Sequence, residues 1–301
     1  MNASNSDRLI ELIGNRNLLQ KKYVEKNNST FDEEEIEAFD MLISYYIEQG
    51  ETVESLADLY LAYIDDLMEE RYFFVQHGCY RYASAEEVYG IFYENQQYMK
   101  IYMVGLALST FLLTSHREYM KWYKDCIRKY CGGGKAWLEV GPGHGVYFTY
   151  AVNHTEYDCY YGIDLSQTAV DMSRSIIGKQ VNGQKQVVIE KKDFLELSDD
   201  KKYDAIIAGE VLEHVEDPGL FLRKMKRLAK QDAFIYVTTA INCPQKDHIY
   251  LFQTIEEVET LIRDSGLKIA DRLYVPTNGY SLEKAVRKAV AINVAYVLAR
   301  G

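Results

Sequence analysis

The stretch Trp137-Leu-Glu-Val-Gly-Pro-Gly-His-Gly145 decides the fold of this chain. It begins as an apolar run, interrupted by Glu139, of the kind that forms a buried strand. Glycines then follow at every second position, at 141, 143 and 145, and this density lets the backbone turn sharply and approach a ligand without a Cβ in the way. A strand that ends in such a turn, with a helix after it, presents free N–H groups to a polar ligand. The stretch therefore predicts a ligand site at the end of a strand.

Residues 131–301 alternate short apolar runs with helical stretches. The apolar runs read KAWLEVG, YDCYYGID, QVVIEKKDF, YDAIIAGE, DAFIYVTTA, LKIADRLYV and INVAYVLAR. Strands that alternate with helices form right-handed βαβ units. The sequence therefore predicts an α/β fold with a doubly wound, seven-stranded, mostly parallel, Rossmann-like sheet. Ligands of such sheets bind beyond the carboxyl ends of the strands, which is where the glycines lie.

Residues 1–130 show apolar side chains at helical spacing instead. Thr30 with Glu33, and Ser84 with Glu87, have the spacing of a capping box and predict two helix starts. Three consecutive glycines at 132–134 separate this part from the rest. We therefore expect a helical region over residues 1–130 and a ligand-binding domain over residues 131–301.

The charge of the chain is uneven. The formal net charge is −11, and residues 1–130 hold 13 Lys and Arg against 22 Asp and Glu. An acidic surface repels phosphate backbones, so we expect no nucleic-acid partner. The cysteines show no metal-binding spacing, the N-terminus lacks the pattern of a signal peptide, and the longest apolar run, residues 101–113, is too short to cross a bilayer. We expect a cytoplasmic protein with no membrane partner.

The glycine spacing separates two classes of nucleotide ligand. The dinucleotide fingerprint is GxGxxG, whereas this chain has GxGxG. Glu139 would repel a pyrophosphate but suits a cation. Asp164 ends the second apolar run, where a carboxylate can accept hydrogen bonds from both ribose hydroxyls of an adenosine. A ligand with an adenosine, no phosphate and a cationic end is S-adenosylmethionine.

Four motifs extend this interpretation. They are Glu139-Val-Gly-Pro-Gly-His-Gly145, Asp164, Lys192-Asp193-Phe194 after the third run and Gly209-Glu-Val-Leu-Glu-His-Val215 after the fourth. With these motifs in order, residues 131–301 resemble the class I S-adenosylmethionine-dependent methyltransferases. The resemblance implies the methyltransferase form of the Rossmann-like fold, with the all-helical region packed over the open end of the sheet as a lid.

The resemblance also implies which residues touch the cofactor S-adenosylmethionine. These are Glu139, Gly141, Gly143, Gly145, Asp164, Asp193, Phe194 and Glu210. The glycines would let the loop pass under the methionine part. Among the others, Asp164 would bind the ribose hydroxyls, Asp193 and the backbone of Phe194 the adenine edge, and Glu139 the amino group, while Glu210 would lie beside the sulfonium.

Two histidines are candidates for the chemistry. Methyl transfer needs an aligned acceptor and, for a protonated acceptor, a group that removes its proton. His214 follows the fourth apolar run and His248 follows the fifth, so both can face the substrate. A purely structural histidine is an equally good interpretation of His248.

A metal site is a second interpretation of the same part of the sequence. Glu210, Glu213 and His214 have the i, i+3, i+4 spacing of one helical face, and with His248 they could hold a divalent ion. This ExxEH pattern resembles the metal site of small-RNA terminal 2′-O-methyltransferases and of ubiquinone O-methyltransferases, in which the ion clamps vicinal hydroxyls. From the sequence we favour no metal, with Glu213 and His214 capping and orienting the helix that starts at Pro218.

The expected substrate is a small-molecule methyl acceptor. Aromatic walls suit a small, partly apolar or cationic molecule, and we expect it between the helical region and residues 242–252. Oxygen is the first choice of methylated atom, and nitrogen is the second. The alternative functions are a non-catalytic cofactor-binding scaffold and a nicotinamide-dependent oxidoreductase. The helical region also allows an oligomer contact. Aromatic side chains at helical spacing pack in a core more often than they line a pocket, and both interpretations apply to the aromatic candidates, Tyr89, Tyr93, Tyr98, Tyr102, Trp122 and Tyr123.

Overall fold

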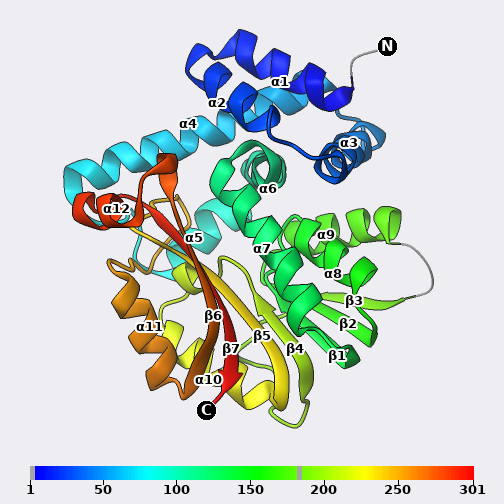
Figure 1. The fold of residues 1–301 in the computed structure, drawn as a ribbon, viewed down its shortest axis with the longest axis vertical. Coiled ribbons are helices and arrows are strands. Elements are labelled where there is room, and N and C mark those ends of the chain that lie inside the picture. Colours follow the sequence, from blue (N-terminus) through cyan, green and yellow to red (C-terminus); the bar gives the residue numbers. More distant parts are fainter. Residues whose placement is uncertain (1–3, 182–184) are drawn as a thin grey trace.

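The computed structural model describes residues 4–181 and 185–301. At its centre is a seven-stranded sheet with the order β3-β2-β1-β4-β5-β7-β6 (Figure 1). The pairs from β3 to β5 are parallel, and β7 is antiparallel to both of its neighbours. The prediction of a seven-stranded, mostly parallel, Rossmann-like sheet is confirmed. The strands are β1 (Gly134–Val140), β2 (Tyr157–Asp164), β3 (Gln186–Lys191), β4 (Tyr203–Ala208), β5 (Ala229–Ile241), β6 (Leu267–Pro276) and β7 (Ile292–Arg300).

Both faces of the sheet are covered by helices. Neighbouring side chains on a strand point to opposite faces, and the side chains on each face belong to an apolar cluster. In β1, Trp137 belongs to one apolar cluster, together with Phe148 and Ile176. Its neighbour Leu138 belongs to a second cluster with Leu222. The helices that supply these and related contacts are α8 (Val146–His154), α9 (Gln167–Gln180), α10 (Pro218–Leu228), α11 (Ile255–Asp264) and α12 (Leu282–Lys288).

The predicted helical region is present before the first strand. Its α7 packs on the sheet, where the ring of Tyr123 lies 5.0 Å from that of Tyr236 in β5. One apolar cluster runs from α1 through α7 to this face of the sheet, so the division at residue 130 stays a prediction. The helices are α1 (Asn5–Arg16), α2 (Leu18–Asn28), α3 (Glu33–Glu48), α4 (Val53–His77), α5 (Ala85–Val88), α6 (Gln96–Leu112) and α7 (Thr114–Tyr130).

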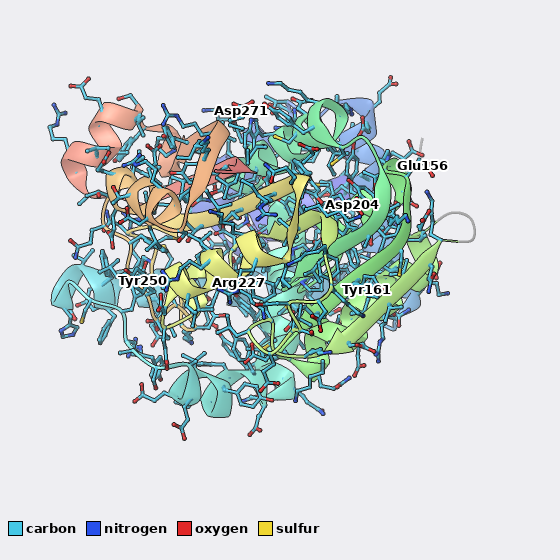
Figure 2. The ribbon with its side chains drawn as sticks, turned by 90° about the horizontal axis from the view of Figure 1, so that it is seen from below. Glu156, Tyr161, Asp204, Arg227, Tyr250 and Asp271 are labelled. Atoms are coloured by element: carbon cyan, nitrogen blue, oxygen red, sulfur yellow. The ribbon has the colours of Figure 1, made fainter. Side chains whose placement is uncertain are left out.

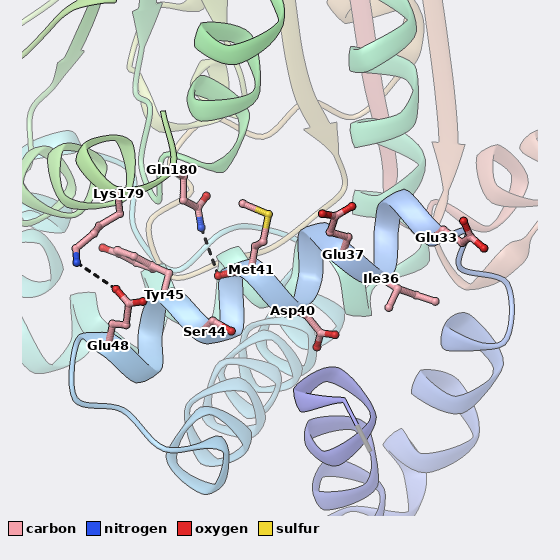
Figure 3. Close-up of a pocket in the computed structure, with 10 residues that line it drawn as sticks. All are labelled: Glu33, Ile36, Glu37, Asp40, Met41, Ser44, Tyr45, Glu48, Lys179 and Gln180. Carbon is pink, nitrogen blue, oxygen red and sulfur yellow. Dashed lines mark hydrogen bonds and ion pairs between the residues drawn. The ribbon is translucent and has the colours of Figure 1, made fainter. Parts of the chain in front are cut away.

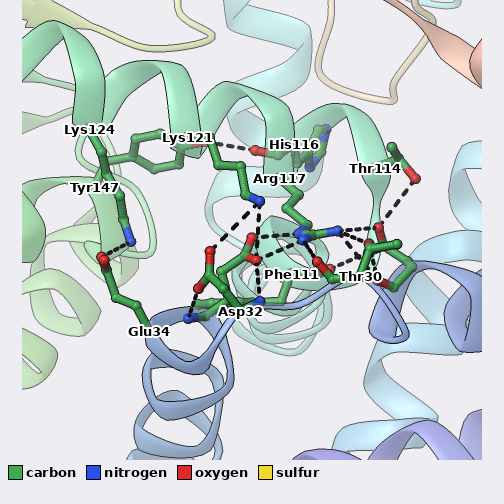
Figure 4. A network of polar contacts seen from close by, with 12 residues as sticks. Thr30, Asp32, Glu34, Phe111, Thr114, His116, Arg117, Lys121, Lys124 and Tyr147 are labelled. Atoms are coloured by element: carbon green, nitrogen blue, oxygen red, sulfur yellow. Dashed lines mark hydrogen bonds and ion pairs between the residues drawn. The ribbon is translucent and has the colours of Figure 1, made fainter.

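A buried ion-pair network fixes the first helices to α7 (Figure 4). The guanidinium of Arg117 donates to the carboxylate of Glu35 at 2.7 Å and to the hydroxyl and carbonyl oxygens of Thr30 at 2.6 Å each. Burial raises the pKa of Glu35, but the hydrogen bonds from Arg117 and its neighbours outweigh burial and bring the pKa to about 2. Buried charges are tolerated only with such partners, so the network fixes the position of α3 relative to α7.

The first predicted helix start is shifted by two residues. Asp32 caps α3, because its carboxylate accepts from the backbone N–H of Glu35 at 2.9 Å and its own N–H donates to the carboxylate of Glu35 at 3.0 Å. The prediction that Thr30 and Glu33 form this capping box is therefore wrong. The hydroxyl of Thr30 instead accepts a hydrogen bond from Arg117, which is 87 positions away.

The second predicted helix start is confirmed, although the helix is short. Ser84 caps α5 by accepting from the backbone N–H of Glu87 at 3.3 Å. After one turn the chain widens into a π-helical turn over Tyr89–Tyr93. Such turns are rare and occur often at functional sites. This one lies near the end of the sheet at which the parallel strands finish (Figure 1).

Within the parts of the chain that the structure describes, no single helix is both long enough and apolar enough to cross a membrane. By length and composition α6 and α7 meet that criterion only together, and they are bent by 76° at the break between them.

One carboxylate ties together the opposite, amino ends of three central strands. Asp204 of β4, labelled in Figure 2, accepts from the backbone N–H groups of Lys135 and Ala136 in β1 at 3.0 Å each. It also pairs with Lys230 of β5 at 2.8 Å. The carboxylate of Asp204 is engaged in these contacts at the amino ends of the strands, and the predicted site residues lie at the carboxyl ends.

Candidate functional site

The glycine loop follows β1 at the carboxyl edge of the sheet. Gly141, Gly143 and Gly145 have φ angles of +69°, +53° and +80°, a region that side chains disfavour. A Cβ on Gly141 would lie 2.9 Å from Val211, and one on Gly145 would lie 2.6 Å from Ile176. The predicted loop therefore needs glycine for its backbone angles and, at two positions, for space.

Asp164 ends β2 and reaches back to this loop. Its carboxylate accepts from the backbone N–H of Ser166 at 2.9 Å and from that of Gly143 at 3.4 Å. Burial raises the pKa of Asp164 to about 6, although the two N–H groups act in the opposite direction. The structure thus places the predicted ribose-binding carboxylate next to the glycine loop.

Glu139 lies two residues before the loop and is 4% exposed. Its carboxyl group accepts from the indole N–H of Trp137 at 3.3 Å. Burial raises the pKa of Glu139 to about 8, and the indole opposes this only in part. An acid that burial keeps uncharged loses its proton readily when a cation approaches.

Asp193 and Phe194 follow β3 and have partners within the chain. Asp193 accepts from the backbone N–H of Leu195 at 2.8 Å, which orders the turn. Phe194 is buried, and its ring lies 4.4 Å from that of Phe221 in α10. Their contact with adenine stays a prediction.

Glu210 follows β4, which neighbours β1 where the strand order reverses. Its φ of +51° is uncommon for a residue with a Cβ, and strain of this kind concentrates at functional sites. The backbone N–H of Glu210 donates to the hydroxyl of Thr238 at 2.9 Å. Among the described residues its buried Oε1 has no hydrogen-bond partner, and a buried acceptor normally has one.

Glu213 is fully buried rather than part of a solvent-facing turn. It lies in a 3₁₀ turn, Leu212–His214, and its Oε2 accepts from the hydroxyl of Thr239 at 2.6 Å. Its Oε1 is buried and accepts from no N–H or hydroxyl group in the described part of the chain, and the carboxyl group of Glu210 is its neighbour. Burial raises the pKa of Glu213 well above its usual value, and the charge of Glu210 adds to this. The two carboxyl groups are therefore neighbours that a cation would stabilise.

The helix that starts at Pro218 is capped by Asp217. The carboxylate of Asp217 accepts from the backbone N–H of Leu220 at 2.8 Å. The interpretation that Glu213 and His214 cap this helix is therefore wrong, because the acid directly before the helix does so.

The structure brings His214 and His248 together, with ring centroids 4.8 Å apart and planes at 90°. The Nδ1 of His214 lies 3.0 Å from the backbone carbonyl of Asp247, and that of His248 lies 2.7 Å from the carbonyl of Cys243. A carbonyl oxygen only accepts, so each neutral ring carries its proton on Nδ1 and its lone pair on Nε2. Burial and then His214 lower the pKa of His248 to about 3, so this ring is neutral at physiological pH.

Glu213, His214 and His248 fit a divalent cation. One ligand atom from each lies within 4.8 Å of the other two. Two imidazole nitrogens and a carboxylate oxygen suit ions such as Zn²⁺, Co²⁺ or Mn²⁺, and backbone carbonyls on the opposite ring nitrogens are a usual outer support. Glu210 adjoins this group without being one of the three. Our sequence-based reason for expecting no metal, a capping turn that faces solvent, does not hold.

The aromatic residues of the helical region divide into two groups. Trp122 and Tyr123 of α7 pack on Tyr236 of the sheet, with ring centroids 5.5 and 5.0 Å away. They belong to the core. Tyr98 and Tyr102 of α6 stack on each other, with centroids 6.1 Å apart, and Lys246 of the segment 242–252 lies 5.7 Å over the ring of Tyr98. The second group therefore faces the segment where we expect the acceptor.

Asp247 was not identified from the sequence. It is 2% exposed, its Oδ2 lies 3.4 Å from the Nδ1 of His214, and the hydroxyl of Tyr93 donates to the same oxygen at 3.2 Å. Its Oδ1 is buried with no partner within residues 4–181 and 185–301. The available signal was its place beside His248, in a segment that follows a strand at the carboxyl edge.

A cavity of about 820 Å³ lies away from these residues, between α3 and the end of α9 (Figure 3). Lys179 pairs there with Glu48 at 3.1 Å, and the side chain of Gln180 donates to the carbonyl of Met41 at 3.4 Å. None of the motif residues lines it. We therefore place the site at the carboxyl edge of the sheet.

Residues 113–258 match the model of a family described as a methyltransferase domain. The matched range is just under half of the chain, and it contains the glycine loop, Asp164, Asp193 and both histidines. No curated protein matches the chain.

Solved structures of similar fold include two methyltransferases. The N-methyltransferase NodS from Bradyrhizobium japonicum WM9, in complex with S-adenosyl-L-homocysteine, matches with a TM-score of 0.47 at 17% identity, over 62% of this chain and 88% of that one. Magnesium protoporphyrin IX methyltransferase from Synechocystis PCC 6803, with bound SAM, matches with a TM-score of 0.48 at 16% identity, over 62% of this chain and 80% of that one.

Proposed function

We propose, from the match of residues 113–258 to a methyltransferase domain, that the protein transfers a methyl group from S-adenosylmethionine to an oxygen of a small molecule. The observation that carries the choice of oxygen is the group of Glu213, His214 and His248. This group adjoins the cofactor residues, since Val211, two residues before Glu213, lies 2.9 Å from the position of a Cβ on Gly141.

In our proposal the cofactor is S-adenosylmethionine, and each of its parts contacts a named residue. The buried acidic residues support this assignment. Asp164 holds the ribose hydroxyls, Asp193 and the backbone of Phe194 hold the adenine edge, and Glu139 and Glu210 face the amino group and the sulfonium. Burial raises the pKa values of Glu139, Asp164 and Glu210. A ligand with two positive centres offsets the cost of ionising such groups.

Cofactor binding should release a proton from Glu139. With a pKa of about 8, Glu139 is mostly protonated at neutral pH, and a cationic amino group nearby lowers that pKa. We expect about 0.9 proton released per S-adenosylhomocysteine bound at pH ~7. Calorimetry in buffers of different ionisation enthalpy measures this number. The release should fall to about 0.1 proton in Glu139→Gln, the part that Asp164 supplies with its pKa of about 6. Proton uptake, or an unchanged release in that variant, would contradict the assigned role.

In our proposal Glu213, His214 and His248 would hold a divalent cation beside the acceptor. Such an ion would supply a Lewis acid that lowers the pKa of a hydroxyl and orients two adjacent oxygens. The closeness of the three ligand groups and the two Nε2 lone pairs support this choice. It replaces our sequence-based preference for a metal-free site.

The chain itself aligns the reactants. The hydroxyl of the acceptor gives its proton to solvent as the acceptor binds. Its oxygen then attacks the methyl carbon while the carbon–sulfur bond breaks and its electron pair stays on sulfur. The glycine loop and Asp164 fix the cofactor for this in-line attack, and the burial of the site excludes water. In a metal-free version the Nε2 of His214 or His248 would take the proton of the acceptor, since each ring carries its own proton on Nδ1.

The charges at the site favour a neutral or cationic acceptor. The basic residue of the segment 242–252, Lys246, is already paired with Asp66 at 2.7 Å. Residues 1–130 hold 13 Lys and Arg against 22 Asp and Glu, and this excess of acid repels a phosphate ester or nucleic acid. A small-molecule acceptor, no nucleic-acid partner and a helical lid therefore remain our proposals, as does a cytoplasmic location. The carboxyl groups at the site are Asp164, Glu210, Glu213 and Asp247.

Transfer of a labelled methyl group to three probes tests the oxygen assignment. We expect a catechol to accept the label at least about tenfold faster than a phenol, because two adjacent oxygens can be held at once, and an amine to accept little. Transfer to the amine alone would overturn the assignment. Tight binding of S-adenosylhomocysteine without turnover on any probe would favour the scaffold alternative, whereas a preference for NAD would favour the oxidoreductase.

A further inference from the structure

A short part of the helical region crosses the carboxyl edge of the sheet. We call residues 84–93, which contain α5 and the π-helical turn, the bridging segment. The backbone N–H of Ala85 donates to the carboxylate of Glu216, after β4, at 3.2 Å, and Lys191, at the end of β3, donates to the hydroxyl of Tyr89 at 2.9 Å. In the sheet, β2 and β1 lie between β3 and β4. The two contacts therefore flank the strand ends that carry Asp164 and the glycine loop.

Tyr93 is the last residue of the bridging segment, and its hydrogen bond is more buried than those of Ala85 and Tyr89. Its hydroxyl donates to Oδ2 of Asp247 at 3.2 Å. Burial raises the pKa of Tyr93 well above its usual value, and the charges of Asp247 and Asp164 add to this. The hydroxyl therefore stays a donor to Asp247, the residue whose backbone carbonyl is bonded to His214.

Asp247 is fixed independently of the bridging segment. Its neighbour Lys246 pairs with Asp66 of α4 at 2.7 Å, and the backbone N–H groups of Ile249 and Tyr250 donate to the carbonyl of Glu213 at 2.9 and 3.0 Å. Asp247 therefore stays with the sheet and α4 if residues 84–93 move, and the bond to Tyr93 breaks.

We infer that Tyr93 is a positioning residue that holds the bridging segment closed, so that the cofactor enters and leaves only when the Tyr93–Asp247 hydrogen bond breaks. The inference rests on the cofactor site of the proposed function. The bridging segment is bonded to the chain on both sides of the strand ends that carry Asp164 and the glycine loop. A ligand reaches residues covered in this way only after the cover moves.

Binding kinetics of S-adenosylhomocysteine test this role. We expect Tyr93→Phe to raise the association and dissociation rate constants together, each by about five- to tenfold, because it removes one hydrogen bond of the closed state. The dissociation constant should stay within about twofold, since both the free and the bound protein lose that bond. Stopped-flow fluorescence measures the rates, and calorimetry measures the dissociation constant.

Tyr89→Phe is the matched control, because it removes the same atom from the same segment but breaks only an exposed contact. Its rates should change less than about twofold. Asp247→Asn keeps an acceptor for Tyr93 and should stay closer to wild type than Asp247→Ala, and adding Tyr93→Phe to Asp247→Ala should change little further. Unchanged rates in Tyr93→Phe, or a rise in the dissociation rate alone, would overturn the inference. Failure of the wild type to bind S-adenosylhomocysteine would instead overturn the proposed function and the inference with it.

Discussion

Asp164→Ala should weaken the binding of S-adenosylmethionine and S-adenosylhomocysteine by about thirty- to hundredfold. Asp164 is held by the backbone of Gly143 and Ser166 at the end of β2, so its carboxylate is fixed before the ligand arrives. Losing a buried, charged acceptor for two ribose hydroxyls costs about 2–3 kcal/mol, which is this factor in affinity. Calorimetry on the purified chain measures it.

Asp158→Ala is the matched control, since Asp158 is exposed near the other end of the same strand. Its affinity should change less than about twofold, as for most surface substitutions. An Asp164→Ala variant that binds as tightly as the wild type would contradict the ribose assignment. A wild-type chain that prefers NAD to both ligands would contradict the cofactor itself.

The pH dependence of binding follows from the same residue. Burial raises the pKa of Asp164 to about 6, and only the ionised form accepts from both hydroxyls. The affinity should therefore fall as the pH decreases through 6. Glu139, with a pKa of about 8, acts in the same direction, because the cofactor binds the form that has lost its proton. Affinity should rise in two steps with pH, and Glu139→Gln should remove the upper step.

The fold could be predicted because its signals are local. Each strand is an apolar run of its own, and the glycine loop needs angles that glycine adopts easily. The prediction that a helix starts at Thr30 failed because the hydroxyl of Thr30 accepts a hydrogen bond from Arg117, a residue 87 positions away. A contact over that distance leaves no pattern in the residues around the cap, so the neighbouring Asp32 took the role instead.

The site was harder to predict where burial decides the chemistry. The spacing of the ExxEH residues predicted that Glu210, Glu213 and His214 lie close together. It did not predict that Glu213 is fully buried, because an acidic residue in such a stretch is usually exposed. Asp247 was missed because its partner Tyr93 lies 154 positions earlier. Its importance comes from the packing of the helical region on the segment 242–252, which the sequence of either part does not reveal.

Removing the proposed cation should lower methyl transfer by about a hundredfold or more, since a bound ion supplies several kcal/mol of stabilisation. Added Zn²⁺, Co²⁺ or Mn²⁺ should restore transfer better than Mg²⁺, because two of the ligand atoms are imidazole nitrogens. Glu213→Gln, which keeps the size of the side chain, should lower the affinity for Co²⁺ by about a hundredfold or more, because losing a ligand costs at least as much as the roughly ten- to hundredfold lost with an outer-shell partner. Calorimetry and the absorbance of bound Co²⁺ measure this without an acceptor.

Glu216→Gln is the control for this loss, because Glu216 is an exposed carboxylate three residues further along the same loop. It should bind Co²⁺ as the wild type does, and both variants should keep their affinity for S-adenosylhomocysteine. Activity that ignores chelators and survives Glu213→Gln, yet disappears in His214→Gln or His248→Gln, would show that a histidine takes the proton and that no ion is needed. The two outcomes differ because an ion needs the carboxylate and both Nε2 lone pairs at once, whereas a base needs only one of the rings.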